Sequence, residues 1–183
     1  MPSIVTKLVG ALAVIAAVAM VYALGSQLIK SSMMQTISAE DVSVDEAIDV
    51  AQGALDACKS GGPAISVAVV DEAGQVRFLL RGDNATPDMA DKARRKAYTA
   101  RTFRMATSDW VERTSDEAVD EKGVKRDLGG QRYLDNTLAE PGGMPIIKHG
   151  QAIGGVGVSG SQDPMTDEHC AQAGVDAIAD QFF

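Results

Sequence analysis

The chain has 183 residues, a formal net charge of −8 and an isoelectric point near 4.7. An acidic domain repels phosphate backbones, which argues against nucleic acid as a partner. Aromatic residues make up only 4% of the chain, so its core has to be built from aliphatic side chains and closely packed glycines. The part beyond the apolar N-terminal segment is long enough for one domain with a core of its own.

The N-terminal segment has the pattern of a signal peptide or a membrane anchor. Lys7 precedes an uncharged run from Leu8 to Leu24, whose length lies between that of a cleaved signal and that of a membrane span. Cleavage before Ser26 and an uncleaved anchor both predict export, into the periplasm or out of the cell, with tethering to the inner membrane in the second case. We assign residues 1–30 to this leader or anchor, 31–41 to a linker and 42–183 to the folded domain.

The domain is expected to begin with a helix and a hairpin. Ser43 and Glu46 form a capping-box pattern, and apolar residues at helical spacing follow it. The helix should end at the sequence "GGP" of residues 61–63. The strands "AISVAVVD" and "QVRFLLR" then flank the turn "DEAG", which predicts a β-hairpin.

A second long helix is predicted from Thr86 and Pro87, with a stripe dominated by alanine that permits tight packing. The basic cluster of residues 94–96 in this helix is interpreted as a solvated face. Residues 105–127 are polar around Trp110 and predict one short helix and an exposed loop.

A glycine-rich strand follows in a second hairpin, "MPIIKHGQAIGGVGVSG", which turns at His149 and Gly150. Glycine weakens a strand, so its repetition implies that another backbone or a flat ligand approaches closely. The last helix should be capped by Asp163 or Thr166. Two hairpins between helices predict an antiparallel sheet with helices packed against it, an α+β fold.

The two cysteines, Cys58 and Cys170, both lie on apolar stripes of predicted helices. Their spacing does not match a structural zinc site, and the simplest interpretation is two small buried side chains. A disulfide between them requires the first and last helices to pack together.

Four segments in the same order resemble the GlcG/HbpS family, which includes the C-terminal domain of PduO-type proteins. They are "ISVAVVDEAGQVRFLLRGDNA", "ADKARRKAYTA", "PGGMPIIKHGQAIGGVGVSG" and "DEHCAQAGVDAI". The resemblance implies a profilin-like α+β domain with a five-stranded antiparallel sheet and homo-oligomers. It also implies haem binding for several exported members, whereas other members accompany glycolate or diol metabolism.

His169 and His149 are the only histidines, so they are the candidate imidazole ligands of a haem iron. We expect His169 in the first turn of the last helix, whose positive end favours an anion such as a propionate and keeps the ring neutral. A solvated surface residue is the alternative. His149 is explained by left-handed turn geometry, but an exposed hairpin tip would also suit a haem shared between subunits.

Three further residues are candidate contacts of a cofactor: Arg81 at the end of a strand, and Gly155 and Gly157 in the glycine-rich strand. For Arg81, however, an ion pair with Asp83 or Asp71 that fixes the loop is the favoured role. Cys170 could serve as a thiolate ligand, although a core position is favoured.

No nucleophile–base set or metalloprotease motif is present in the sequence, which argues against an enzyme. The family resemblance, together with the export pattern and the position of His169, implies an exported, oligomeric haem-binding module that senses or handles haem. Two alternatives remain. One is an accessory protein that binds a small molecule of an organic acid or diol pathway without haem, and the other is a purely structural oligomer element.

Overall fold

The computed structural model describes residues 20, 41–61, 64–115 and 134–182. The chain divides into two units, residues 1–39 and 40–183, and the second is the folded domain. Of the first unit only Met20 is described, so the predicted leader and almost all of the linker lie outside the described residues. Within the described ranges, no helix combines the length and hydropathy that a membrane span needs.

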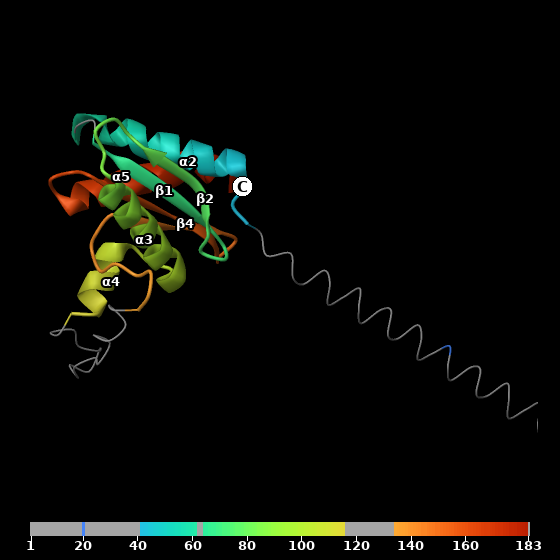
Figure 1. Cartoon of the computed structure of the whole chain (residues 1–183). Helices are drawn as coiled ribbons and strands as arrows, with labels where there is room; N and C mark the ends of the chain where they lie inside the picture. Colours follow the sequence, from blue (N-terminus) through green and yellow to red (C-terminus); the bar gives the residue numbers. More distant parts are fainter. Residues whose placement is uncertain (1–19, 21–40, 62–63, 116–133, 183) are drawn as a thin grey trace, which may run out of the picture. The chain divides into compact units, whose positions relative to one another are not determined.

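A four-stranded antiparallel sheet runs through the domain, with the strand order β2-β1-β4-β3 (Figure 1). The predicted hairpins are both formed, and the α+β class is confirmed. The fifth strand that the family resemblance implies is not among the described residues. The strands are β1 (Ser66–Asp71), β2 (Val76–Arg81), β3 (Gly143–Lys148) and β4 (Gln151–Ser159).

The turn between β3 and β4 confirms the prediction at the pair His149 and Gly150. His149 has a φ of 49° and Gly150 a φ of 77°. Positive φ at both central residues matches the two-residue turns whose twist suits a hairpin. Backbone geometry therefore accounts for the position of His149.

The helices begin where their caps were predicted. The Ser43 side chain accepts a hydrogen bond from the Glu46 backbone in a complete capping box, Thr86 caps the second long helix, and Asp163 caps the last. These caps satisfy backbone N–H groups that a helix start leaves without partners. The α-helices are α2 (Val44–Ala57), α3 (Pro87–Phe103), α4 (Thr107–Arg113) and α5 (Pro164–Asp176), and the short 3-10 helices are η1 (Cys58–Gly61) and η3 (Ala179–Phe182).

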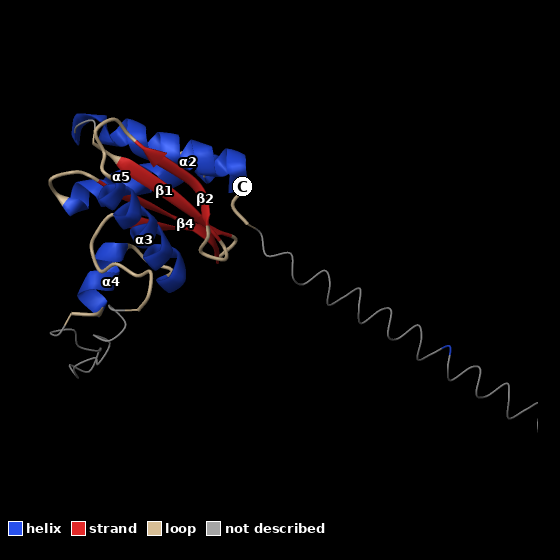
Figure 2. Ribbon diagram, viewed as in Figure 1, coloured by secondary structure: helices blue, strands red, loops and turns tan. Residues whose placement is uncertain are grey.

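Alternate side chains of the two central strands build two different cores. Val67, Val69, Val156 and Val158 pack with buried residues of α2 and α5, whereas Ala68 and Val70 pack with alanines of α3. The helices α2 and α3 therefore lie on opposite sides of the sheet, as Figure 2 shows. Small side chains on the α3 side let this helix approach the strands closely.

The glycines of β4 explain that close approach. A Cβ atom at Gly157 would lie 2.1 Å from the carbonyl oxygen of Ala93, and one at Gly155 would lie 2.5 Å from that of Ala97. Of the two alternatives that the sequence left open, another backbone is therefore the one found. Within the chain, α3 covers these two positions, so a flat ligand does not reach Gly155 or Gly157 and the prediction that they contact a cofactor is not supported.

Cys58 and Cys170 form a disulfide, with 5.5 Å between their Cα atoms. Because α2 and α5 pack together on one face of the sheet, the condition that the sequence set for this bond is met. The bond links positions 112 residues apart in the sequence. A thiolate of Cys170 is therefore not available as an iron ligand, and that alternative is wrong.

Candidate functional site

A cleft of about 410 Å³ lies between β2 and the start of α3. This volume falls within the range of about 300–1,000 Å³ that is typical of small-molecule sites. The cleft is open to solvent, and it lies on the side of the sheet that α3 covers. Its lining residues are Leu79, Arg81, Pro87, Ala90, Asp91 and Arg94.

The apolar part of the cleft follows from strand alternation and from the start of the helix. Leu79 and Arg81 pair with Ala68 and Ser66 of β1, so their side chains share the face that α3 covers. Leu79 is 46% exposed, because β2 is an edge strand and α3 does not extend fully over it. Together with Pro87 and Ala90, it forms an apolar floor that is partly open to water.

Three charged residues line the cleft, and two of them neutralise each other. The Arg94 guanidinium donates to the Asp91 carboxylate at 2.8 and 3.1 Å, and to the Asn136 side-chain oxygen at 3.2 Å. Arg81, in contrast, has no hydrogen bond or ion pair from its side chain within the described ranges. It is therefore the charge in the cleft that remains available to a ligand.

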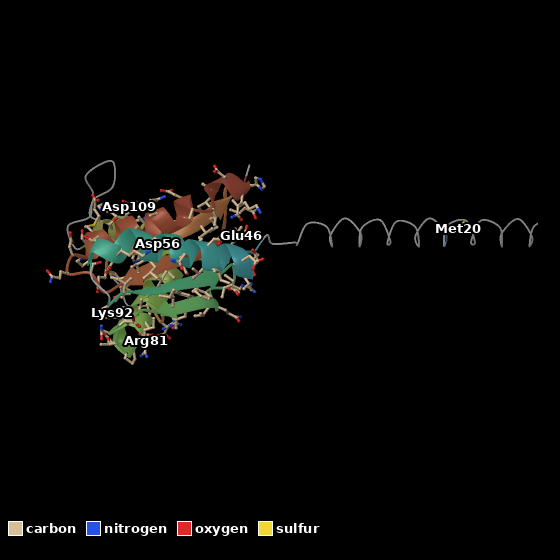
Figure 3. The ribbon with its side chains drawn as sticks, turned by 90° about the horizontal axis from the view of Figure 1, so that it is seen from above. Met20, Glu46, Asp56, Arg81, Lys92 and Asp109 are labelled. Atoms are coloured by element: carbon tan, nitrogen blue, oxygen red, sulfur yellow. A yellow bond between two sulfur atoms is a disulfide. The ribbon has the colours of Figure 1, made fainter. Side chains whose placement is uncertain are left out.

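The predicted internal partners of Arg81 do not pair with it. Asp71 instead pairs with Arg77, at 3.4 Å, and also accepts a hydrogen bond from the backbone of Gln75. Figure 3 shows Arg81 at the margin of the domain, on the same side as Lys92 of α3. Lys92 forms an ion pair with Asp88 at 3.6 Å, so its charge is partly compensated.

A second polar site, which we call the Lys96 network, is centred on a buried lysine and reaches the surface at Glu140. Lys96 of α3 has no exposed surface, and its amino group lies 3.3 Å from Asp167 and 3.1 Å from Glu140. Asp167 also accepts a hydrogen bond from the Ser161 backbone at 3.0 Å. The prediction that residues 94–96 form a solvated helix face is therefore wrong for Lys96, which is buried and paired.

Glu168, the neighbour of Asp167, is held by several donors. It accepts hydrogen bonds from the Thr107 hydroxyl at 3.1 Å, the Ser108 backbone at 2.9 Å and the Gly142 backbone at 3.1 Å. The carboxylates of Asp163, Asp167 and Glu168 therefore all lie in or next to the first turns of α5. They neutralise the positive end of the helix, where the sequence predicted that a propionate would bind.

The two histidines lie apart from the cleft. His169 is exposed on α5, which packs on the face of the sheet opposite to α3. His149 is exposed at the β3–β4 turn, whereas Arg81 pairs with Ser66 at the opposite end of the sheet. The structure thus does not bring His149, His169 and Arg81 into one site within a single chain.

The described part of the chain offers few groups that could bind a metal ion. It contains no group of three or more histidine, cysteine or acidic residues that could hold a metal ion.

The carboxyl group of Asp56, which is exposed, has a shifted pKa. A hydrogen bond from Lys59 holds the pKa of Asp56 below its usual range. This pair lies at the end of α2 and does not face the cleft.

The family model described as "Haem degrading protein HbpS-like" matches residues 42–176. The crystal structure of a double mutant of HbpS from Streptomyces reticuli is 31% identical, with a TM-score of 0.67, and the match covers 76% of this chain and 88% of that one. Protein GlcG of Escherichia coli (strain K12) is 31% identical over 98 residues, which are 52% of this chain and 64% of GlcG. The crystal structure of a PduOC–haem complex is 22% identical, with a TM-score of 0.65 over 76% of this chain and 96% of that one, and this likeness shows a common fold.

Proposed function

The chain belongs to the HbpS-like family, and from this premise we propose that it is a haem-binding module that holds the porphyrin in the cleft between β2 and α3. The observation that carries the proposal is the combination of an apolar floor with the guanidinium of Arg81, which has no partner in the described part of the chain. A flat apolar ring that bears carboxylates matches both features. Relatives described as haem-degrading or solved with haem support this ligand.

The residues of the cleft fit part of the haem group. Leu79, Pro87 and Ala90 offer apolar surface to the plane of the ring, and the planar fork of Arg81 matches a propionate in two parallel hydrogen bonds. The residue types of the lining do not include the usual axial ligands of haem iron. If the iron is ligated at all, the imidazole has to come from His169 or His149 of a second copy, since neither lies at the cleft of its own chain. Bound haem would supply the redox and ligand-binding chemistry of its iron, while the chain holds and orients the ring.

Export is part of this proposal, and the disulfide supports it. Disulfides persist mainly in oxidising compartments such as the periplasm and the extracellular space. A bond between Cys58 and Cys170 is therefore consistent with the apolar segment from Leu8 to Leu24 acting as a leader or anchor. Oligomerisation is a further part, because the open cleft would leave one face of the ring uncovered unless a second copy packed over it.

A titration of the purified protein with hemin, followed by its Soret absorption, tests the proposal. We expect a saturable band with wild-type protein and weaker binding by Arg81→Gln. The matched control is Arg113→Gln, because Arg113 is an exposed arginine of α4 that does not line the cleft. Only the unsaturable absorption of free hemin with wild-type protein would rule the proposal out.

A small carboxylate is a second candidate ligand, and the absence of axial-ligand residue types from the cleft lining favours it. In that case the protein would be an accessory binding protein and Arg81 would still be the contact. Thermal shift with a panel of small organic acids, with no response to hemin, would distinguish this function from haem binding.

A further inference from the structure

We propose that the cleft selects its ligand through a carboxylate rather than through iron, so that it binds iron-free dicarboxylic porphyrins as tightly as haem. This inference rests on the proposed function and specifies which part of the ligand is recognised. Three properties of the described residues support it. The lining contains no ligand for iron, Arg81 is the charged side chain of the cleft that has no partner among these residues, and apolar side chains lie beside its guanidinium.

The first property is that the cleft offers iron no ligand. Its lining has aliphatic side chains, two arginines and one aspartate, and that aspartate is engaged by Arg94. The imidazoles of His149 and His169 lie at the other end and the other face of the sheet, and both cysteines are bound in the disulfide. Within one chain, an iron atom at the centre of a ring in this cleft would add no coordination bond to the binding energy.

The second property is that Arg81 is the available cation of the cleft. Arg94 already donates to Asp91 and Asn136, and Lys92 on the same side of the domain already pairs with Asp88. The guanidinium of Arg81 keeps all five of its N–H donors for a ligand, since none is used within the described ranges. Its fork geometry favours a group with two coplanar oxygens, which is a carboxylate.

The third property is the apolar floor next to this guanidinium. A ring lying over Leu79, Pro87 and Ala90 would remove water from the surroundings of Arg81. Charge pairs are stronger where water is excluded than on an open surface. The ring and the carboxylate therefore reinforce each other, and a ligand that has only one of them should bind more weakly.

Three probes separate these contributions in direct binding titrations: hemin, protoporphyrin IX and the dimethyl ester of protoporphyrin IX. We expect hemin and protoporphyrin IX to bind wild-type protein with dissociation constants within about threefold of each other. The ester keeps the ring but loses the charges, so it should bind at least about tenfold more weakly, as expected for the loss of a charge-assisted pair. Porphyrin fluorescence reports the binding of both iron-free probes.

The substitution Arg81→Gln assigns the effect to one side chain. It should weaken binding of protoporphyrin IX at least about tenfold and leave binding of the ester unchanged, which makes the two probes equivalent. Arg81→Lys keeps the charge without the fork and should lie between wild type and Arg81→Gln. Arg113→Gln should behave as wild type, and thermal melting of each variant checks that it is folded.

The outcomes separate this inference from the proposed function. If hemin binds and protoporphyrin IX does not, iron is recognised, the inference is wrong and the haem-binding function stands. Equal affinities for the acid and the ester would also overturn the inference, because the ring alone would then account for binding. Failure of both hemin and protoporphyrin IX to bind would instead overturn the proposed function itself.

Discussion

The Lys96 network and the Arg81 cleft show two opposite ways of placing a cation next to α3. Lys96 is completely buried and lies within 3.3 Å of two carboxylates. Arg81 is exposed at the end of an edge strand and has no partner within the described ranges. The first cation has all its interactions inside the protein, whereas the second has its donors directed at solvent.

This difference distinguishes a charge that stabilises the fold, which we call a structural charge, from a charge that is available to a ligand, which we call a binding charge. A buried charge is tolerated only where partners compensate for the loss of water, and the Lys96 network joins α3, α5 and the segment before β3 through such partners. An exposed charge contributes little to folding and can be lost without penalty. The comparison therefore predicts that substitutions in the network change stability, whereas those in the cleft change binding.

The largest effect on stability is expected from Lys96→Met, which keeps the length of the side chain and removes its charge. Asp167 would then be a buried carboxylate without its cation, which should lower the free energy of unfolding by about 3–5 kcal/mol. Urea denaturation measures this change. The matched control is Lys92→Met, whose exposed pair with Asp88 should contribute about 0.3–0.5 kcal/mol. A stability of Lys96→Met within about 0.5 kcal/mol of wild type would contradict the structural role of the network.

The disulfide is expected to have the next largest effect, because it ties α5, which carries Asp167 of the network, to the end of α2. Reduction of the wild-type protein should lower its stability by about 2–4 kcal/mol, since the bond links residues 112 positions apart. Melting with and without reductant measures the effect. The double variant Cys58→Ala/Cys170→Ala should melt at the same temperature in both conditions. An equal response of the variant to reductant would show that the bond is not the cause.

Local signals in the sequence predict where the helices begin and where the second hairpin turns. The capping residues Ser43 and Thr86 start their helices as predicted, and the pair His149 and Gly150 forms its turn. Each of these signals acts within a few residues, so the sequence alone reveals it. For Arg81, the sequence favours an ion pair that fixes the loop, whereas in the structure this residue lines the cleft and forms no pair with Asp71 or Asp83.

The remaining parts depend on contacts between distant segments. Lys96 follows two arginines, a pattern that is typical of a solvated helix face. Its burial results from the packing of α3 against the start of α5. The sequence "DE" of residues 167–168 has the ordinary appearance of acids in the first turn of a helix, so it gave no sign of a buried network. The approach of α3 to Gly157 likewise depends on how a helix lies on the sheet, so the spacing of the glycines could not distinguish a backbone from a ligand.

A smaller loss of stability is expected from Gly157→Ala, which tests the contact between α3 and β4. The added methyl group would lie 2.1 Å from the Ala93 carbonyl oxygen, so α3 has to move, at a cost of about 1–3 kcal/mol. Because α3 supplies four of the cleft's lining residues, the same variant should also bind porphyrin more weakly. Denaturation and porphyrin titration of one preparation measure both effects. Wild-type stability together with wild-type binding would show that this contact does not position the cleft.

The smallest effect on stability is expected from Arg81→Met, the same change of cation to methionine in the other region. Arg81 is exposed and has no partner among the residues that the structure describes, so the free energy of unfolding should stay within about 0.5 kcal/mol of wild type. Binding of protoporphyrin IX should nevertheless fall at least about tenfold, because the methionine cannot donate to a carboxylate. Denaturation and porphyrin titration of Arg81→Met and Lys96→Met under the same conditions compare the two variants in free energy of unfolding and in affinity. A loss of stability in Arg81→Met comparable to that in Lys96→Met would mean that Arg81 is a structural residue, and the separation of binding charge from structural charge would fail.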